Sequence, residues 1–345
     1  MGDVYSKVKV AAVQASPIFL DREGTIEKAC RLIEEAAKKD AKIIGFSECF
    51  VPGYPHWLDW AKAGDQKKVR ARYLQLFKNA VEVPSRSTDD LCEVAGQNDC
   101  YVVIGINEKV KGMMGTLYNS QLFIGRNGKL LGKRRKLVPT YGERFVHTGG
   151  DGTDLPVFET DYGRLGGLIC GEHNNPLAKF TLFAKGENVH VGSWPAFTLR
   201  EANRFIMQQC AFEGKLFAVA ASDFFSREMK EQLGEDAAHV EPGGGGSAVY
   251  SPWGEVLVKA ANDREEIIYA DVDLEEVVKA KMVHDVVGHY NRFDIFRLYV
   301  NEEKHVPIRF IHEGETGEPE SIKELEDVAK KMESRRHLLQ PASSS

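Results

Sequence analysis

The sequence has no long apolar run and no organised set of cysteines. No stretch approaches the ~18 consecutive apolar residues of a membrane-spanning helix, so we expect no membrane partner. The six cysteines form no CxxC pair and show no regular spacing, and the first residues, "MGDVYSKVKVAAVQ", lack a signal-peptide pattern. These absences predict reduced thiols and a cytoplasmic location rather than a disulfide framework.

A surplus of positive charge is also missing. The chain has 45 lysines and arginines against 51 aspartates and glutamates, and a formal net charge of −6. Nucleic-acid binding depends on neutralising phosphates, so no nucleic-acid partner is expected. With 43% hydrophobic and 28% charged residues, the composition is typical of a folded globular protein.

What the chain does contain is an alternation of strand and helix patterns. Residues 8–16 and 42–48 are short apolar runs typical of buried strands, and the segment between them, 24–41, repeats apolar residues at helical spacing. The pair Asn127-Gly128 is a strong two-residue hairpin signal. Strands that alternate with helices and then pair as hairpins predict an α/β fold with a mixed sheet.

No internal domain boundary or repeat is visible. We therefore expect a single domain over residues 1–314. The polar stretch 224–243 is interpreted as a loop or flap. Residues 315–345 form a charged C-terminal extension with one expected helix at 320–336, and the last residues, "PASSS", are expected to fray.

Cys170 stands at an unusual place in the stretch "GRLGGLICGEHNNPLAKF". It ends an apolar strand, and Gly171 leaves space beside the sulfur. Asn175 is a good N-cap and Pro176 suits the first helical position, so we expect a helix to start nearby and its positive end to favour the thiolate. Because free cysteines are usually buried and inert, position alone leaves both readings open.

Two charged residues offer partners for such a thiol. Glu48 ends the apolar strand "KIIGFSE", where burial would raise the pKa of its carboxyl and let it accept a proton near neutrality. Lys136 ends a hairpin strand in "KRRKLVPT" and could supply a fixed positive charge. Taken singly, each also fits a structural role, as a paired carboxylate and a solvated lysine.

Three segments together resemble the nitrilase branch of the carbon–nitrogen hydrolase superfamily: "FSECFVPGYP", "KRRKLVPTYGER" and "LICGEHNNPLAKF". The likeness extends over roughly residues 8–300. It implies a four-layer α-β-β-α sandwich. It also implies that Glu48 is the general base, Lys136 the electrostatic stabiliser and Cys170 the nucleophile, with Glu143 in "YGERF" matching the family's second glutamate.

The chain departs from that family pattern at two positions. Nitrilases often have tryptophan after the cysteine, where this chain has Gly171, and the lysine segment often reads His-Arg-Lys, where this chain has Arg134 before Arg135. The first departure predicts more room beside the sulfur. The second leaves Lys136 in place and leaves the role of the usual histidine neighbour open.

The resemblance implies a thiol nitrilase that hydrolyses an organic nitrile, aryl-aliphatic or aromatic, to the carboxylic acid and ammonia. Its partners would be the nitrile and water, with no metal and no organic cofactor, and copies would form homodimers that assemble into larger homo-oligomers or spiral filaments. We expect substrate contacts at the flanks of the three segments, from Tyr54, Trp57, Gly171, Glu172, Trp194 and Phe197. Aromatic residues there would favour an aryl substrate.

Other readings stay open from the sequence. An aliphatic amidase, a carbamoylase or a cyanide-hydrolysing enzyme would use the same Glu-Lys-Cys triad. A non-catalytic assembly subunit would be expected to lack one member of the triad, and all three are present. A redox-sensing thiol at Cys170 would need a resolving cysteine, and none lies near it in the sequence.

Overall fold

The computed structural model of the chain describes residues 3–58, 66–196, 200–238, 240–306 and 308. The chain divides into one unit from Met1 to Lys304 and a second from His305 to Ser345. The expected extension at 315–345 and its helix at 320–336 lie outside the described residues. The domain limits predicted from the sequence therefore stay a prediction, and the fold below is that of the first unit.

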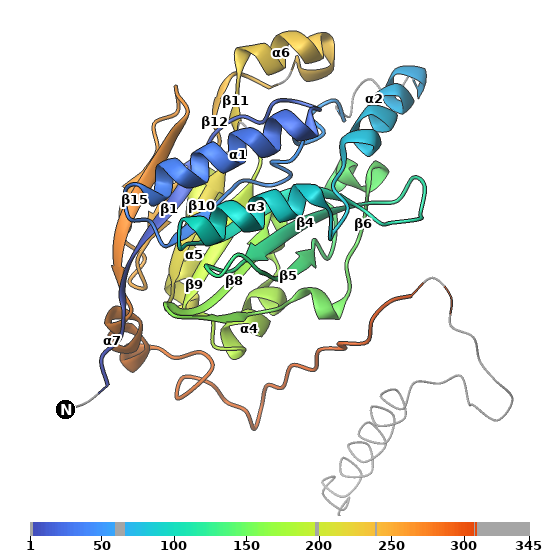
Figure 1. Cartoon of the computed structure of the whole chain (residues 1–345). Helices are drawn as coiled ribbons and strands as arrows, with labels where there is room; N and C mark the ends of the chain where they lie inside the picture. Colours follow the sequence, from blue (N-terminus) through green and yellow to red (C-terminus); the bar gives the residue numbers. More distant parts are fainter. Residues whose placement is uncertain (1–2, 59–65, 197–199, 239, 307, 309–345) are drawn as a thin grey trace, which may run out of the picture. The chain divides into compact units, whose positions relative to one another are not determined.

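The first sheet has the strand order β15-β1-β2-β3-β4-β5, with β6 paired to β4 (Figure 1). Its strands are β1 (Lys7–Gln14), β2 (Ile43–Gly45), β3 (Tyr101–Lys109), β4 (Leu117–Ile124), β5 (Leu130–Arg135), β6 (His147–Thr148) and β15 (Glu266–Asp273). The hairpin predicted at Asn127-Gly128 joins β4 to β5, with Gly128 at a φ of 72°. A turn of this kind needs positive φ, which glycine adopts without strain.

The second sheet has the order β14-β13-β10-β9-β8-β7. Its strands are β7 (Phe158–Thr160), β8 (Gly163–Ile169), β9 (Val189–Trp194), β10 (Phe217–Ser222), β13 (Ala248–Tyr250) and β14 (Val256–Lys259), and a separate pair is formed by β11 (Phe224–Phe225) and β12 (Gly243–Gly244). β8, β9 and β10 are parallel. Their carboxyl ends therefore lie along one edge of the sheet.

The helices of the described residues are α1 (Arg22–Ala37), α2 (Gln66–Asn79), α3 (Arg86–Gln97), α4 (Pro176–Ala184), α5 (Arg200–Gly214), α6 (Arg227–Leu233) and α7 (Glu275–Val283). α1 and α3 pack on the first sheet, and α5 packs on the second. Short 3-10 turns occur at Tyr141–Phe145, Gly152–Asp154, Cys170–Asn174 and Gly234–Ala237.

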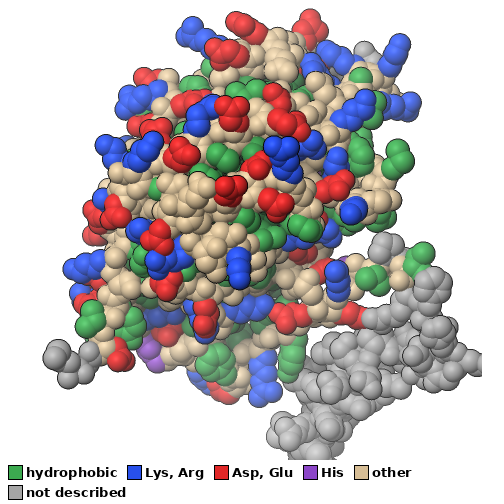
Figure 2. All heavy atoms as spheres, viewed as in Figure 1, with side chains coloured by type: hydrophobic (Ala, Val, Ile, Leu, Met, Phe, Trp, Pro, Cys, Tyr) green, Lys and Arg blue, Asp and Glu red, His purple; other side chains and the backbone are tan. Residues whose placement is uncertain are grey.

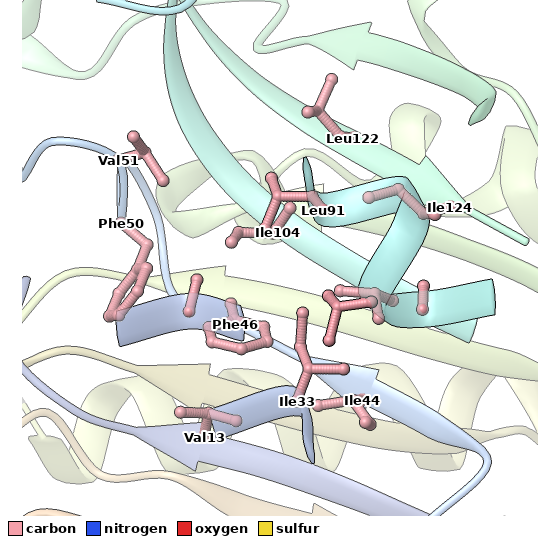
Figure 3. Packing of buried hydrophobic residues seen from close by; sticks show 14 of the residues in the cluster. Val13, Ile33, Ile44, Phe46, Phe50, Val51, Leu91, Ile104, Leu122 and Ile124 are labelled. Atoms are coloured by element: carbon pink, nitrogen blue, oxygen red, sulfur yellow. The ribbon is translucent and has the colours of Figure 1, made fainter. Parts of the chain in front are cut away.

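The two faces of β1 show why its middle residues, Val10–Val13, are all apolar. Val10 and Ala12 pack between the two sheets, whereas Val13 points to the other side, into the cluster under α1 and α3. Figure 3 shows that second cluster, to which β1 contributes Val13, α1 contributes Ile33 and α3 contributes Leu91. A strand buried on both faces cannot alternate polar and apolar residues. The layers run helix, sheet, sheet, helix, which confirms the expected four-layer α-β-β-α sandwich.

The segment 224–243 differs from the loop expected there. It contains α6, and its apolar side chains Met229 and Leu233 are buried in a cluster with Trp57 and Leu76. The apolar residues at 229, 233, 237 and 240 follow a helical spacing inside an otherwise polar sequence. That spacing, rather than the average polarity, determines the local structure.

Positive and negative side chains are interspersed on the face that Figure 2 shows, without a large patch of one sign. This agrees with the absence of a basic surplus in the sequence. Within the part of the chain that the structure describes, none of the helices combines the length and apolar composition needed to cross a bilayer.

Candidate active site

The ends of three strands bring together the residues that match the catalytic triad of the nitrilase branch. Glu48 follows β2, Lys136 follows β5 directly, and Cys170 follows β8 directly. A carboxylate oxygen of Glu48, one of Glu143 and the Cys170 sulfur all lie within 4.8 Å of one another. These side chains are at most 4% exposed. Residues more than a hundred positions apart in the sequence thus form one buried polar group.

Lys136 lies among these acids. Its Nζ donates to Glu48 Oε1 and to Glu143 Oε2, both at 2.7 Å. Two carboxylates and a thiol at this spacing could also hold a metal ion. Here the ammonium of Lys136 already donates to both carboxylates, so the group has its own cation. A positive charge fixed by two acids at this depth is suited to stabilising negative charge that develops beside it.

The backbone is strained at each of the three segments. Cys49, next to Glu48, has a φ of 52°, Tyr141, close to Glu143, has 45°, and Cys170 itself has 51°. Side chains other than glycine rarely adopt the left-handed region, and such residues gather at functional sites. The surrounding packing therefore holds these turns in place against their local preference.

Burial sets the protonation of the base and the thiol. Burial raises the pKa of Glu48 to about 7, with Glu143 adding to the rise and Lys136 opposing it. Burial likewise raises the pKa of the Cys170 thiol well above its ordinary value, and the nearby Glu48 carboxylate adds to this. Cys170 is therefore a neutral thiol at rest.

This corrects the expectation of a helix-stabilised thiolate at Cys170. Asn175 does cap α4, accepting from the backbone N–H of Leu177 at 3.0 Å, and Pro176 is its first residue, as predicted. However, a 3-10 turn over Cys170–Asn174 separates the sulfur from that helix. The helix macrodipole acts mainly within the first turn, so it is too far along the chain to offset burial.

Two polar side chains hold the carboxylates. Tyr54 donates its hydroxyl to Glu143 Oε1 at 2.9 Å, and the Thr140 backbone N–H donates to the other oxygen at 3.1 Å. Asn119 donates to Glu48 Oε1 at 2.6 Å. Tyr54 was expected to contact substrate, and the structure places its hydroxyl on Glu143.

Asn119 was not among the residues predicted from the sequence, although the sequence contains a signal for it. A two-residue turn at Asn127-Gly128 pairs residues whose numbers are symmetric about it, and Ser120 does lie opposite Arg135. One step further, the backbone N–H of Lys136 donates to the Asn119 carbonyl at 2.8 Å. The hairpin register would therefore have placed Asn119 beside the lysine.

Glu172 is used by the protein itself. Arg134 donates to both of its oxygens at 2.7 and 2.8 Å, and the backbone N–H groups of Leu137 and Ile169 donate to it at 2.7 and 2.8 Å. Glu172 was expected to contact substrate, and its hydrogen-bonding positions are instead filled from within. Arg134, at the position of the usual histidine, thus links the segment that carries Lys136 to the 3-10 turn Cys170–Asn174, which we call the cysteine turn.

Four further residues were expected to contact substrate: two are buried tryptophans, one lies outside the described residues, and one is the glycine after Cys170. Trp57 is 5% exposed and packs edge-on against Phe19 at 6.1 Å between ring centroids. Trp194 is 2% exposed and stacks on His173 at 5.0 Å, under the cysteine turn. Phe197 lies outside the described residues. Gly171 has Thr140 as its nearest neighbour, and an added Cβ would lie 2.8 Å from the threonine hydroxyl.

A cleft of about 290 Å³ adjoins the cysteine turn. It is lined by sequence neighbours of the buried site residues, among them Leu137, Thr140 and Gly171. A larger cleft, of about 680 Å³, lies between α1 and α3 and is lined by charged residues such as Arg22 and Glu27. Glu48, Lys136, Glu143 and Cys170 line neither cleft, but the smaller one borders the segments that carry Lys136, Glu143 and Cys170, which makes it the candidate opening.

Comparison with known proteins agrees with this site. A carbon-nitrogen hydrolase family model matches residues 9–282. The chain is 39% identical over 320 residues to a nitrilase of Bacillus sp. (strain OxB-1), covering 90% of this chain and 92% of that protein. It is 37% identical over 320 residues to an aliphatic nitrilase of Rhodococcus rhodochrous, covering 88% and 82%.

A similar fold occurs in the crystal structure of Saccharomyces cerevisiae Nit3, with a TM-score of 0.67 and 23% identity over 83% of this chain and 97% of that one. That likeness concerns the fold alone. The family match over most of the chain, and relatives above 30% identity that cover it almost entirely, establish the kinship. The chain belongs to the carbon–nitrogen hydrolase family and, within it, to the nitrilase branch.

Proposed function

We propose that the protein hydrolyses an organic nitrile to the carboxylic acid and ammonia, with Cys170 as the nucleophile. The observation that carries the proposal is the buried group itself. A neutral thiol lies within 4.8 Å of a carboxylate oxygen of Glu48, and that carboxylate has a pKa raised to about 7 and is held by Lys136. The relatives named as nitrilases support the nitrile as substrate.

Glu48 takes the thiol proton as the Cys170 sulfur attacks the nitrile carbon. A carboxylate with a pKa near neutrality is about half unprotonated at neutral pH and is basic enough to accept this proton. The nitrile nitrogen becomes an imine nitrogen of a thioimidate, and the proton on Glu48 passes to it. Lys136 stabilises the negative charge that develops during the attack.

Water then adds to the thioimidate carbon with Glu48 as the base. The tetrahedral intermediate carries a hydroxyl, an amine and the sulfur, and expulsion of ammonia leaves a thioester on Cys170. A second water releases the carboxylic acid and restores the thiol. If sulfur leaves the tetrahedral intermediate before nitrogen does, the product is the amide. Glu143 acts in this scheme through its hydrogen bond to Lys136, which fixes the position of the ammonium.

The substrate is an aryl-aliphatic or aromatic nitrile in this proposal. The cleft of about 290 Å³ beside Gly171 supports a bulky group next to the reacting carbon. The ring of Tyr54, whose hydroxyl reaches Glu143 in the buried group, supports an aromatic one. The reaction, as proposed, uses water and the nitrile and needs no metal or organic cofactor.

Two further proposals concern the protein as a whole. Apolar side chains exposed along residues 284–304, among them Phe293, Phe296 and Tyr299, support self-association into dimers and larger homo-oligomers. All six cysteines are free, which supports a reducing, cytoplasmic location. Light scattering of the purified full chain would measure the first.

Ammonia release from a panel of nitriles and matching amides tests the function. The panel contains phenylacetonitrile, benzonitrile, 3-phenylpropionitrile, an aliphatic dinitrile and cyanide. We expect turnover of an aryl nitrile well above that of its amide. This activity should be lost in Cys170→Ala and kept in the control Cys100→Ala, which changes a buried cysteine in the cluster under α1 and α3. Turnover of amides alone would indicate an amidase or carbamoylase. Activity that survives in Cys170→Ala would contradict the mechanism.

A further inference from the structure

A line of hydrogen bonds leads from the cysteine turn into the second sheet. His173 Nδ1 lies 2.8 Å from the Cys170 carbonyl oxygen, and His173 Nε2 lies 2.9 Å from His190 Nε2. His190 Nδ1 lies 2.8 Å from Glu187 Oε1. We call Glu187, His190 and His173 the relay. The mechanism above uses none of these three side chains.

The relay is buried and closely surrounded. Its three residues are at most 1% exposed. A Cβ at Gly166 would lie 2.2 Å from Glu187 Oε1, and a Cβ at Gly192 would lie 3.0 Å from His173 Nε2. The two glycines, on neighbouring strands, thus leave the space that the carboxylate and the imidazole occupy. A buried polar chain of this kind is costly unless every bond in it is made.

Counting protons fixes the direction of the chain. The Cys170 carbonyl can only accept, so His173 must donate from Nδ1. Burial lowers the pKa of His173 well below its ordinary value, so this ring is neutral and its Nε2 accepts. His190 must then donate from Nε2. The bond between His190 Nδ1 and Glu187 needs one more proton, held by one of the two, so the relay holds three protons.

The far end of the relay acts on the sulfur through one peptide group. The C=O of Cys170 and the N–H of Gly171 belong to the same trans peptide and point in opposite directions. The N–H is directed at the Cys170 sulfur and lowers the pKa of the thiol. A hydrogen bond to the carbonyl fixes the plane of this peptide and makes its N–H a stronger donor.

We propose that the relay orients and polarises the Cys170–Gly171 peptide, so that the Gly171 N–H stabilises the sulfur and the anion formed on attack. Glu187, His190 and His173 are positioning residues in this account, since none of them touches the reacting atoms. The inference rests on the proposed function where it concerns turnover. The part that concerns sulfur reactivity does not depend on the substrate.

The number of protons in the relay decides which way its hydrogen bonds run. With one proton fewer, the Glu187 carboxylate keeps the N–H of His190 Nδ1, and His190 Nε2 becomes an acceptor. His173 then donates from Nε2 and turns a lone pair toward the Cys170 carbonyl. The charged or titratable groups that face the relay are Lys179 with its partner Glu213, Arg134 with its partner Glu172, and the Cys210 thiol.

Removing the donor to the Cys170 carbonyl is the first test. In His173→Ala, kcat for the nitrile should fall about tenfold with KM nearly unchanged, because one polarised N–H weakens without loss of binding. The rate at which iodoacetamide alkylates Cys170, followed on its peptide by mass spectrometry, should fall similarly. If a folded His173→Ala variant keeps both rates, the proposal is wrong. If alkylation slows in a protein that turns over no nitrile, the relay stands and the proposed function fails.

The second test is the Glu187→Gln variant. Its glutamine side chain has nearly the same shape as the native glutamate. Its amide can donate to His190 Nδ1, so all three hydrogen bonds can be kept with a neutral side chain. We expect Glu187→Gln to keep the kcat and the Cys170 alkylation rate of the wild type, as the control Glu213→Gln does. A folded Glu187→Gln variant in which both rates fall as in His173→Ala would overturn the relay.

Discussion

Arg134 and Lys136 lie two residues apart in the chain, and each pairs with a buried glutamate. The two pairs differ in whether a carboxylate oxygen of the glutamate is left without a hydrogen bond. Arg134 and two backbone N–H groups fill the hydrogen-bonding positions of Glu172. Glu48 receives Lys136 and Asn119 on the same oxygen, Oε1. Its Oε2 is buried and accepts no hydrogen bond within the described part of the chain.

The pKa values of the two glutamates move in opposite directions for this reason. Burial alone would raise both. In Glu172 the charge of Arg134 and the donated hydrogen bonds outweigh burial and hold the pKa below its ordinary value. In Glu48 burial prevails and the pKa rises to about 7. A fully bonded carboxylate stabilises the fold, whereas one with an unused oxygen remains available to take a proton.

Glu48→Gln should give the largest effect. The amide cannot accept the thiol proton, so kcat should fall by ~10⁴-fold, the upper range for loss of a general base. Because Lys136 keeps its partner Glu143, the free energy of unfolding should change by less than about 1 kcal/mol. Ammonia release and urea unfolding of the same preparation measure the two quantities. A variant with near-native kcat would remove Glu48 from the mechanism.

The matched substitution Glu172→Gln should act on stability. It leaves the buried guanidinium of Arg134 without its counter-charge, which costs about 3–5 kcal/mol in such pairs. Urea unfolding should show this loss, while kcat of the folded fraction should fall far less than in Glu48→Gln. If Glu172→Gln proves stable but as inactive as Glu48→Gln, the distinction between the two pairs fails.

The smallest expected effect concerns the pH dependence. Glu48 acts in its unprotonated form, so kcat/KM should decline below pH about 7, by about tenfold for each further pH unit. Asn119→Ala removes a hydrogen bond to the charged carboxylate, which disfavours that form and raises the pKa. The acid limb should therefore move upward by roughly half to one pH unit. A limb that stays in place would show that Asn119 does not tune the base.

Much of the fold followed from local patterns. The apolar runs became β1, β2 and β3, the Asn127-Gly128 pair became the predicted hairpin, and Asn175 with Pro176 began α4. Each of these depends on a few neighbouring residues and their preferred backbone angles. The helix α6 was missed because its four apolar positions are diluted by charged residues, and burial against Trp57 rather than local preference stabilises it.

By itself the sequence determined the strands, the helix starts and the three segments that carry Glu48, Lys136 and Cys170, since strand period, turn chemistry and motif order are local properties. Only the tertiary structure decided which carboxylate stays reactive. Glu48 and Glu172 are the same residue type, and each lies within two residues of a cysteine in the sequence. Their pKa values differ because different numbers of donors reach the carboxylate oxygens. The tertiary structure also decided that His173 of the relay hydrogen-bonds the Cys170 carbonyl. Hydrogen-bond partners and burial depend on elements that come together only when the chain folds.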